Sequence, residues 1–382
     1  MIPLEYLIYI YSLFKRKFQI NKYDLLIYML IFLGIIVTIN TVDVQTSIWG
    51  AYLRNEGFLS IFSYYLLFLN AREFKNLEIK KILHCIFGTE IVQFIYCILQ
   101  VFVRGNYVFS FSEKFAYMAS VFIGNPNMLG SFCLLLVGLS LGIFLVYNNR
   151  KYLWLSVCFF ANLLLAQSTG PFLSFIVLYL FLIIFLLLKK QINFKKIMYV
   201  SLIFLTTLLV VSNGSENYCE EVFGDVILKS SSIRGDMNST LGILNGDSNE
   251  HYGSGRLVIW ENTFKIVPKY FWLGAGIDNF GYVFPPQEFD SYLFGSYVDK
   301  AHNEYLQILI TQGIFTLVIY FGLLLCMFID GARSKDKDVW IFLAGFMGYA
   351  MQAFMNISVT TVAPFYFIIC GFLAGRVYEK KV

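Results

Sequence analysis

The chain has 382 residues, of which 58% are hydrophobic, 19% aromatic and only 14% charged, and its mean hydropathy is +0.66. So little polar surface excludes a soluble globular protein and indicates one that lies in a bilayer. The net charge of +4 is an average over loops of unlike charge, so we expect no nucleic-acid partner.

Apolar segments recur along the chain, and most are close to the length that crosses about 30 Å of hydrocarbon as a helix. We predict ten membrane helices, at about 23–40, 57–70, 82–101, 128–147, 152–167, 171–188, 195–212, 303–329, 339–355 and 360–376. The short stretch 2–14 is either an interfacial helix or a partial eleventh span. The predicted fold is therefore all-α, a polytopic transmembrane helical bundle of about 10–11 spans with one large external loop of short helices.

Basic residues are unevenly divided between the two sides of this predicted bundle. Alternate connections that belong to one side hold 20 of the 29 lysines and arginines. Because basic loops are retained in the cytoplasm, we expect a multi-pass protein of the cytoplasmic membrane with both termini on the cytoplasmic side.

One external connection, residues 213–302, is much longer than the others and is rich in polar residues. A loop of this length in a compact protein is usually functional or disordered. The predicted division is an N-terminal transmembrane bundle at 1–212, a large external loop at 213–302 and C-terminal transmembrane helices at 303–382.

The second half of this loop contains a short amphipathic helix that begins after a candidate N-cap at Ser254 and stops at Pro268. Its apolar positions are Leu257, Trp260, Phe264 and Val267. Arg256 lies in the first turn, where the helix dipole disfavours a cation unless an anion compensates it. Free N–H groups and a guanidinium together suit a phosphate or diphosphate, although a solvated surface arginine is the alternative.

The stretch KAHNEYLQILITQGI, residues 300–314, places His302 in the first turn of a long predicted membrane helix, with Asp299 as a candidate N-cap. The positive end of a helix disfavours imidazolium, so the pKa of His302 should be lowered and the ring neutral. A neutral base at the lipid–water boundary suits chemistry on a lipid-linked substrate. A cap or an interfacial polar group is the alternative.

Further polar residues fall on the same predicted external side, each with a turn or cap as its alternative reading. They are Arg54 and Glu56, Asn125 and Asn127, and Gln167, Ser168 and Thr169. Within the third predicted span Glu90 shares a helical face with Gln93, Cys97 and Gln100, and we favour a structural role for it. Gly274 and Gly276 in WLGAGIDNFG indicate a structural turn rather than a dinucleotide fingerprint.

Cysteine and histidine spacing points to no disulfide framework, metal or cofactor. Of the seven cysteines only Cys219 falls in an external loop, and no pair has the spacing of a zinc site. No DxD-like metal motif appears among the predicted external loops, so we expect the reaction to be independent of metal and cofactors.

Taken in order, the stretches WGAYLRNEG, GNPNMLG, AQSTGPFLS, SGRLVIWENT, WLGAGIDNFG and KAHNEYLQILITQGI resemble the O-antigen ligase and O-antigen polymerase family. The resemblance covers about residues 45–330, and its most specific part runs from Arg256 to Asn303. It implies a bacterial polytopic glycosyltransferase of the C-type fold that acts on undecaprenyl-diphosphate-linked glycans outside the cytoplasmic membrane.

The resemblance also implies roles for single residues. Arg256 engages the donor diphosphate, and His302 activates the acceptor hydroxyl. Many members carry an arginine after the serine of the Ser-x-Gly turn, where this chain has Thr169. Arg54 is the candidate for the missing contact, with Arg104 and Arg234 behind it. The other expected substrate-binding residues are Trp260, Asn303 and Tyr305.

The expected function is that of a polymerase that joins lipid-linked oligosaccharide repeats into a capsular, exopolysaccharide or O-antigen chain. The first alternative is a ligase that moves a finished glycan onto a lipid or protein acceptor, and the second is a flippase for lipid-linked oligosaccharides. The expected partners are an undecaprenyl-diphosphate-linked glycan donor, a glycan acceptor, membrane lipids and a chain-length regulator.

Overall fold

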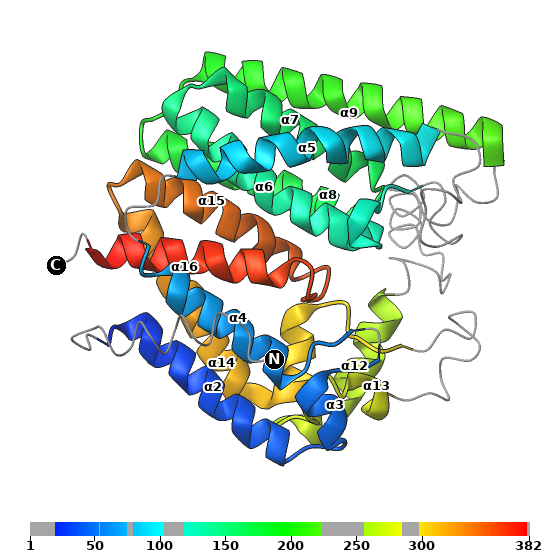
Figure 1. Ribbon diagram of the computed structural model, residues 1–382, viewed down its shortest axis with the longest axis vertical. Helices are drawn as coiled ribbons and strands as arrows, with labels where there is room; N and C mark the ends of the chain where they lie inside the picture. Colours follow the sequence, from blue (N-terminus) through cyan, green and yellow to red (C-terminus); the bar gives the residue numbers. More distant parts are fainter. Residues whose placement is uncertain are drawn as a thin grey trace. The chain divides into compact units, whose positions relative to one another are not determined.

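The computed structural model describes residues 20–52, 54–74, 79–102, 118–223, 256–284 and 298–379, without the side chains of 79–85 and 212–223. These ranges contain helices and no β-strand, which confirms the all-α class (Figure 1). The helices are α2 (Lys22–Ile39), α3 (Val44–Trp49), α4 (Phe58–Ala71), α5 (Ile79–Phe102), η3 (Val121–Ile123), α6 (Pro126–Tyr147), α7 (Arg150–Leu165), α8 (Thr169–Leu188), α9 (Phe194–Phe223), α12 (Arg256–Tyr270), α13 (Phe280–Val283), α14 (Glu304–Arg333), α15 (Lys337–Gln352) and α16 (Ala363–Glu379).

Every predicted membrane segment corresponds to one of these helices. Within the described residues, five helices are long and apolar enough to cross a bilayer, namely α2, α6, α8, α9 and α14. Shorter apolar helices occur at 58–71, 86–102 and 363–378, so the chain is a helical membrane protein. α9 continues to Phe223 and so occupies the start of the predicted external loop. The stretch 2–14 lies outside the described residues.

The chain divides into two compact units. The first unit consists of 1–76, 249–335 and 353–382, and the second of 77–248 and 336–352. The first therefore contains α2–α4, α12–α14 and α16, and the second contains α5–α9 and α15. The boundaries predicted at 212 and 302 concern membrane topology and remain a prediction.

In the second unit α6 is the central helix and is buried along most of its length. Glycines allow α15 to approach it closely, because a Cβ atom at Gly138 would meet the Ala344 carbonyl and one at Gly142 would touch Ile341. Without a hydrophobic driving force between helices in lipid, small residues at the contact are what permit close packing.

Glu90 lies inside this unit with little access to solvent, and its Oε1 accepts a hydrogen bond from Asn162 Nδ2 at 2.7 Å. A carboxyl group in hydrocarbon is costly unless it is paired, so this hydrogen bond ties α5 to α7. The contact agrees with the structural role that we favoured from the sequence.

In the first unit α4 packs against α16, and α2 packs against α14 (Figure 1). Gly371 and Gly375 of α16 lie four residues apart, and a Cβ atom at either one would collide with the backbone of α4. At one end of the unit Arg72 pairs with Asp24, and Lys22 pairs with Asp330. These ion pairs join the start of α2 to the ends of α4 and α14.

Because Gly371 meets the backbone of α4, Gly371→Ala should lower stability even though alanine is the better helix former. We expect a loss of about 1–3 kcal/mol, measured as a lower unfolding midpoint of the purified protein in detergent. Gly322→Ala is the matched control, since an added Cβ there meets nothing within 4 Å. Equal midpoints for the two variants would contradict the close contact.

Candidate functional site

α14 is broken at Gly313, whose φ of 79° and ψ of 174° are not helical. The helix therefore has two arms, 304–312 and 314–333. Tyr320 O–H donates to Glu304 Oε1 at 3.0 Å, and the rings of Tyr305 and Phe321 stack with centroids 4.8 Å apart. In a straight helix residues this far apart in sequence would be separated by about 24 Å. The prediction of one continuous helix over 303–329 is thus wrong at Gly313.

The loop between α12 and α13 satisfies the backbone groups that the break leaves open. The N–H groups of Ala275 and Gly276 donate to the carbonyls of Ile310 and Thr311, both at 2.9 Å, and Ile314 N–H donates to Phe271 O at 2.8 Å. Irregular backbone at membrane depth is tolerated only where protein satisfies it in this way. The loop and the broken helix therefore form one hydrogen-bonded structure.

Glycines at 274 and 276 make this loop possible, as the sequence indicated. Their φ angles of 75° and 110° are left-handed, and a Cβ at Gly274 would collide with the backbone at Thr311. Asn279 then fastens the loop to α3 and its N-cap, because its Nδ2 donates to Ser47 Oγ at 2.8 Å and its Oδ1 accepts from Asp43 N–H at 2.9 Å.

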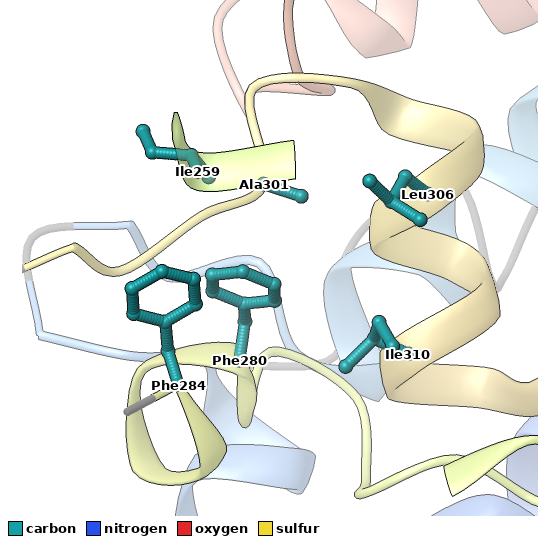
Figure 2. Close-up of a cluster of buried hydrophobic side chains, with 6 residues drawn as sticks. All are labelled: Ile259, Phe280, Phe284, Ala301, Leu306 and Ile310. Atoms are coloured by element: carbon teal, nitrogen blue, oxygen red, sulfur yellow. The ribbon is translucent and has the colours of Figure 1, made fainter. Parts of the chain in front are cut away.

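A hydrophobic cluster holds α12, α13 and the first arm of α14 together, as Figure 2 shows. Its buried members are Ile259, Phe280, Phe284, Ala301, Leu306 and Ile310. Ala301 belongs to the segment 298–303 that precedes α14. The cluster therefore anchors this segment at its centre.

Hydrogen bonds from three residues, Trp260, Gln307 and Arg54, hold the segment 298–303 in place. Trp260 Nε1–H donates to the Ala301 carbonyl at 2.9 Å, and Ala301 N–H donates to Gln307 Oε1 at 2.8 Å. Arg54 binds Asp299 through two contacts, Nε to Oδ2 at 2.5 Å and a terminal N–H to Oδ1 at 3.0 Å. Burial raises the pKa of Asp299, but the hydrogen bonds and charge of Arg54 outweigh it, so that pKa is lowered overall.

His302 lies between these anchors in a left-handed conformation with φ 50°. Such a conformation is uncommon for a residue with a Cβ and persists only where the surroundings impose it. Its Nδ1 is buried and has no hydrogen-bond partner among the residues that the structure describes. The strained backbone and this unpaired nitrogen single His302 out within the segment.

The charges around His302 keep the imidazole neutral. Burial lowers its pKa most, Arg256 and then Arg54 lower it further, and Asp299 acts in the opposite direction, which leaves a pKa of about 4. Arg256 is thus near enough for its charge to act on His302. The predicted direction of the shift is confirmed, but its cause is burial and two arginines rather than the helix N-terminus.

Lys300, which precedes this histidine by two residues, is buried in a cluster of opposite charges. Its ammonium lies 2.5 Å from Asp278 Oδ1 and 3.2 Å from Glu56 Oε2. Ser358 O–H donates to Glu56 Oε1 at 2.6 Å. Burial alone lowers the pKa of Lys300, but Glu56 and Asp278 more than compensate, so the pKa of Lys300 is raised and it stays charged.

A cavity of about 60 Å³ adjoins this cluster, with Glu56, Asp278 and Lys300 in its wall. Both arms of α14 line it, including Glu304 and Gln307 from the first arm. His302, Arg256 and Arg54 are not among the lining residues. The charges of Arg256 and Arg54, which lie outside the segment 298–303, therefore act on His302, whereas Lys300 of the segment lies in the wall of a mainly acidic cavity.

Several predicted site residues have structural contacts. Asn303, and not Asp299, is the N-cap of α14, because its Oδ1 accepts from Leu306 N–H at 3.0 Å. Tyr305 is buried and packs against Phe321 and Phe354. Trp260 donates its indole N–H to the Ala301 carbonyl, which leaves stacking on sugars as a prediction for its ring faces.

The predicted apolar positions of α12 differ in their exposure. Leu257 and Phe264 are 47% and 62% exposed, whereas Ile259, Asn262 and Thr263 are buried. The face that turns inward is the one that meets the hydrophobic cluster, and apolar spacing on the helix alone does not identify that partner. Pro268 lies within α12 and does not end it. Ser254 lies outside the described residues.

The two polar turns GNPNMLG and AQSTGP contact each other in the second unit, where Ser168 O–H donates to Asn127 Oδ1. Thr169 begins α8. Their position on the same external side as Arg256 and His302 remains a prediction. Arg104 and Arg234 lie outside the described residues.

Sequence reasoning missed Asp278, Lys300, Glu304 and Gln307 as members of the site. Lys300 and Glu304 flank His302 in sequence, and a buried lysine needs an acidic partner. No sequence signal connected Lys300 to Asp278, which is 22 positions away, or to Glu56, which precedes a different helix. Among the described residues no group of three or more histidines, cysteines and carboxylates is arranged to hold a metal ion.

Comparison with known families supports the family resemblance. The family model described as O-Antigen ligase matches residues 154–321. This range contains the Ser-x-Gly turn, α12, the loop that fills the break in α14 and His302. No curated protein matched the chain. The family resemblance drawn from the motifs is therefore confirmed over these residues.

Lys300→Met should destabilise the protein strongly, because it leaves Glu56 and Asp278 as buried carboxylates without their cation. We expect a loss of about 3–5 kcal/mol, measured by unfolding in detergent. Adding Glu56→Gln and Asp278→Asn to Lys300→Met should recover most of that loss. If the triple variant is no more stable than the single one, the ion cluster is not the cause.

Proposed function

Residues 154–321 form an O-antigen ligase family domain, and from this premise we propose that the chain is a polysaccharide polymerase. The chain is a membrane enzyme of the glycan-transferring O-antigen ligase or polymerase type. As a polymerase it joins undecaprenyl-diphosphate-linked oligosaccharide repeats on the outer face of the cytoplasmic membrane. The product is a capsular, exopolysaccharide or O-antigen chain.

The proposal is supported by the buried His302, on which the charges of Arg256 and Arg54 act so that its imidazole stays neutral, and by the contacts of Arg54 with Asp299 in the same segment. A neutral imidazole accepts a proton, and arginines stabilise a diphosphate by charge-assisted, often bidentate hydrogen bonds. Base and anion-binding groups at one place are what glycan transfer from a lipid diphosphate requires.

In the proposed reaction an acceptor hydroxyl oxygen forms a bond to the anomeric carbon of the donor glycan. The bond from that carbon to the diphosphate oxygen breaks, and its electron pair leaves with undecaprenyl diphosphate. His302 takes the proton of the hydroxyl as general base, and Arg256 meets the charge that develops on the leaving group. We propose that these residues catalyse the transfer without a metal or a cofactor.

Binding of the donor also prepares the base. The positive charges of Arg256 and Arg54 lower the pKa of His302 in the free protein. A diphosphate between these groups offsets that charge, so the pKa of His302 rises and the ring accepts a proton more readily. The donor thereby increases the basicity of the group that activates the acceptor.

We propose that Arg54 has a positioning role that Arg256 lacks. Its two contacts with Asp299 hold the segment that carries His302. We infer that Arg54 positions this segment and contributes its remaining N–H groups to the diphosphate, in place of the arginine that Thr169 replaces. We propose that the lysine-rich connections and both termini lie in the cytoplasm.

The function is tested by polymer synthesis in cells whose own copy of the gene is deleted. His302→Ala and Arg256→Ala should each remove the long-chain products, since one lacks the base and the other the diphosphate contact. Losses of about a hundredfold or more are expected for either group. The control is Arg150→Ala at the start of α7, which should give a normal ladder of chain lengths at equal protein amounts.

A normal ladder from His302→Ala would refute the proposed base. The same gel distinguishes a polymerase from a ligase. A ligase defect leaves long chains on undecaprenyl diphosphate and removes them only from the final acceptor, whereas a polymerase defect leaves single repeat units.

The pH dependence of the reaction follows from the lowered pKa of His302. A base must be unprotonated to act, so activity is lost as the pH falls through its pKa. The acid limb of kcat/KM, which reports the free protein, should lie well below the ordinary histidine value of about 6.5. The acid limb of kcat should lie higher, because bound donor offsets the two arginines. An acid limb of kcat/KM above 6.5 would contradict the charge arrangement.

A further inference from the structure

The cavity in the first unit contains polar groups that the described part of the chain does not satisfy. Gln307 and Tyr64 both line it and are only 8% and 4% exposed. Gln307 Nε2 and the Tyr64 hydroxyl are buried and have no hydrogen-bond partner among the described residues. Buried polar groups are almost always satisfied, so these two require a partner that the described residues do not supply.

The unsatisfied group of Gln307 is a donor. Its Oε1 accepts the Ala301 N–H at 2.8 Å, which fixes the amide orientation and leaves the NH₂ facing the cavity without an acceptor. The occupant of the cavity must therefore offer an acceptor oxygen.

The carboxylates in the wall set a second requirement. Glu56, Asp278 and Glu304 are opposed by one cation, Lys300, which already pairs with two of them. Like charges in a poorly hydrated site repel, so this cavity rejects a phosphate. Carboxylate oxygens have several lone pairs and accept hydrogen bonds from an occupant that donates. A group that both accepts and donates, and is uncharged, is a hydroxyl.

The cavity is large enough for such an occupant. Its volume of about 60 Å³ is several times the roughly 10–15 Å³ that a single water needs. A hydroxymethyl arm therefore fits. Apolar side chains in the wall, such as Ile308 and Ile357, suit its methylene group.

We propose that this cavity is a carbohydrate subsite that binds a hydroxymethyl or comparable hydroxyl-bearing arm of the lipid-linked glycan. The inference rests on the proposed function and deepens it by dividing the substrate between two environments. The diphosphate binds at the cationic groups near His302, and a neutral hydroxyl arm binds in the acidic cavity. Water is the other source of the same chemistry.

The test compares two ligands on protein that does not turn over. Purified full-length His302→Ala protein in lipid nanodiscs is titrated with undecaprenyl-diphosphate-linked oligosaccharide extracted from cells that make it, and separately with undecaprenyl diphosphate. Two cavity variants are added to this background. Tyr64→Phe removes only the hydroxyl, and Gln307→Glu removes the donor but keeps an acceptor for Ala301 N–H.

Each cavity variant should bind the lipid-linked oligosaccharide about fivefold to tenfold more weakly, the usual effect of one lost hydrogen bond. Binding of undecaprenyl diphosphate should not change, and this also shows that the variants fold. Tyr179→Phe in the second unit is the matched control, because it removes a tyrosine hydroxyl bonded to Ser201 and should leave both affinities unchanged.

Equal affinity of all proteins for the oligosaccharide ligand would overturn the subsite and leave water as the occupant. An equal loss of affinity for both ligands would also overturn the subsite, since the residues would then have a structural role. These results leave the proposed function intact. If the His302→Ala protein with an unaltered cavity binds neither ligand, the proposed function fails and the subsite fails with it.

Discussion

The break in α14 at Gly313 is the constraint on which the arrangement of the first unit depends. It opens a helix inside an apolar segment and exposes backbone groups that lipid cannot satisfy. The N–H groups of Ala275 and Gly276 close this gap, and an added Cβ at Gly313 would collide with the Trp272 carbonyl. Helix and loop therefore require each other, and the loop brings Asp278 to the site.

The same break brings the two arms of α14 together and so creates the cavity between polar groups of both. Glu304 and Tyr320 meet there only because the helix turns back on itself. The segment before the first arm is then fastened by Arg54, Trp260 and the hydrophobic cluster. His302 acquires its left-handed backbone and its charged neighbours from these contacts and not from its own helix.

The two oppositely charged neighbours in the segment 298–303, Asp299 and Lys300, pair with different elements and not with each other. Asp299 is paired with Arg54, and Lys300 is paired with Glu56 and Asp278, so neighbouring residues of opposite charge find their partners in different elements. This alternation leaves Arg256 and Arg54 to act on His302, while carboxylates dominate the cavity. An anionic leaving group and a neutral sugar hydroxyl require such different surroundings.

The amino-acid sequence by itself determined the all-α class, the positions of the apolar helices and the family over residues 154–321. Those features depend on local hydropathy and on motif order. The direction of the pKa shift at His302 was also predicted, but its cause, burial and the charges of two distant arginines, came from the tertiary structure. The tertiary structure alone decided the break at Gly313, the buried face of α12, the pairing of Lys300 with Glu56 and Asp278, and the cavity. Each of these depends on which distant backbone or charged group comes to lie opposite the residue concerned. The periodicity along one helix does not identify that partner.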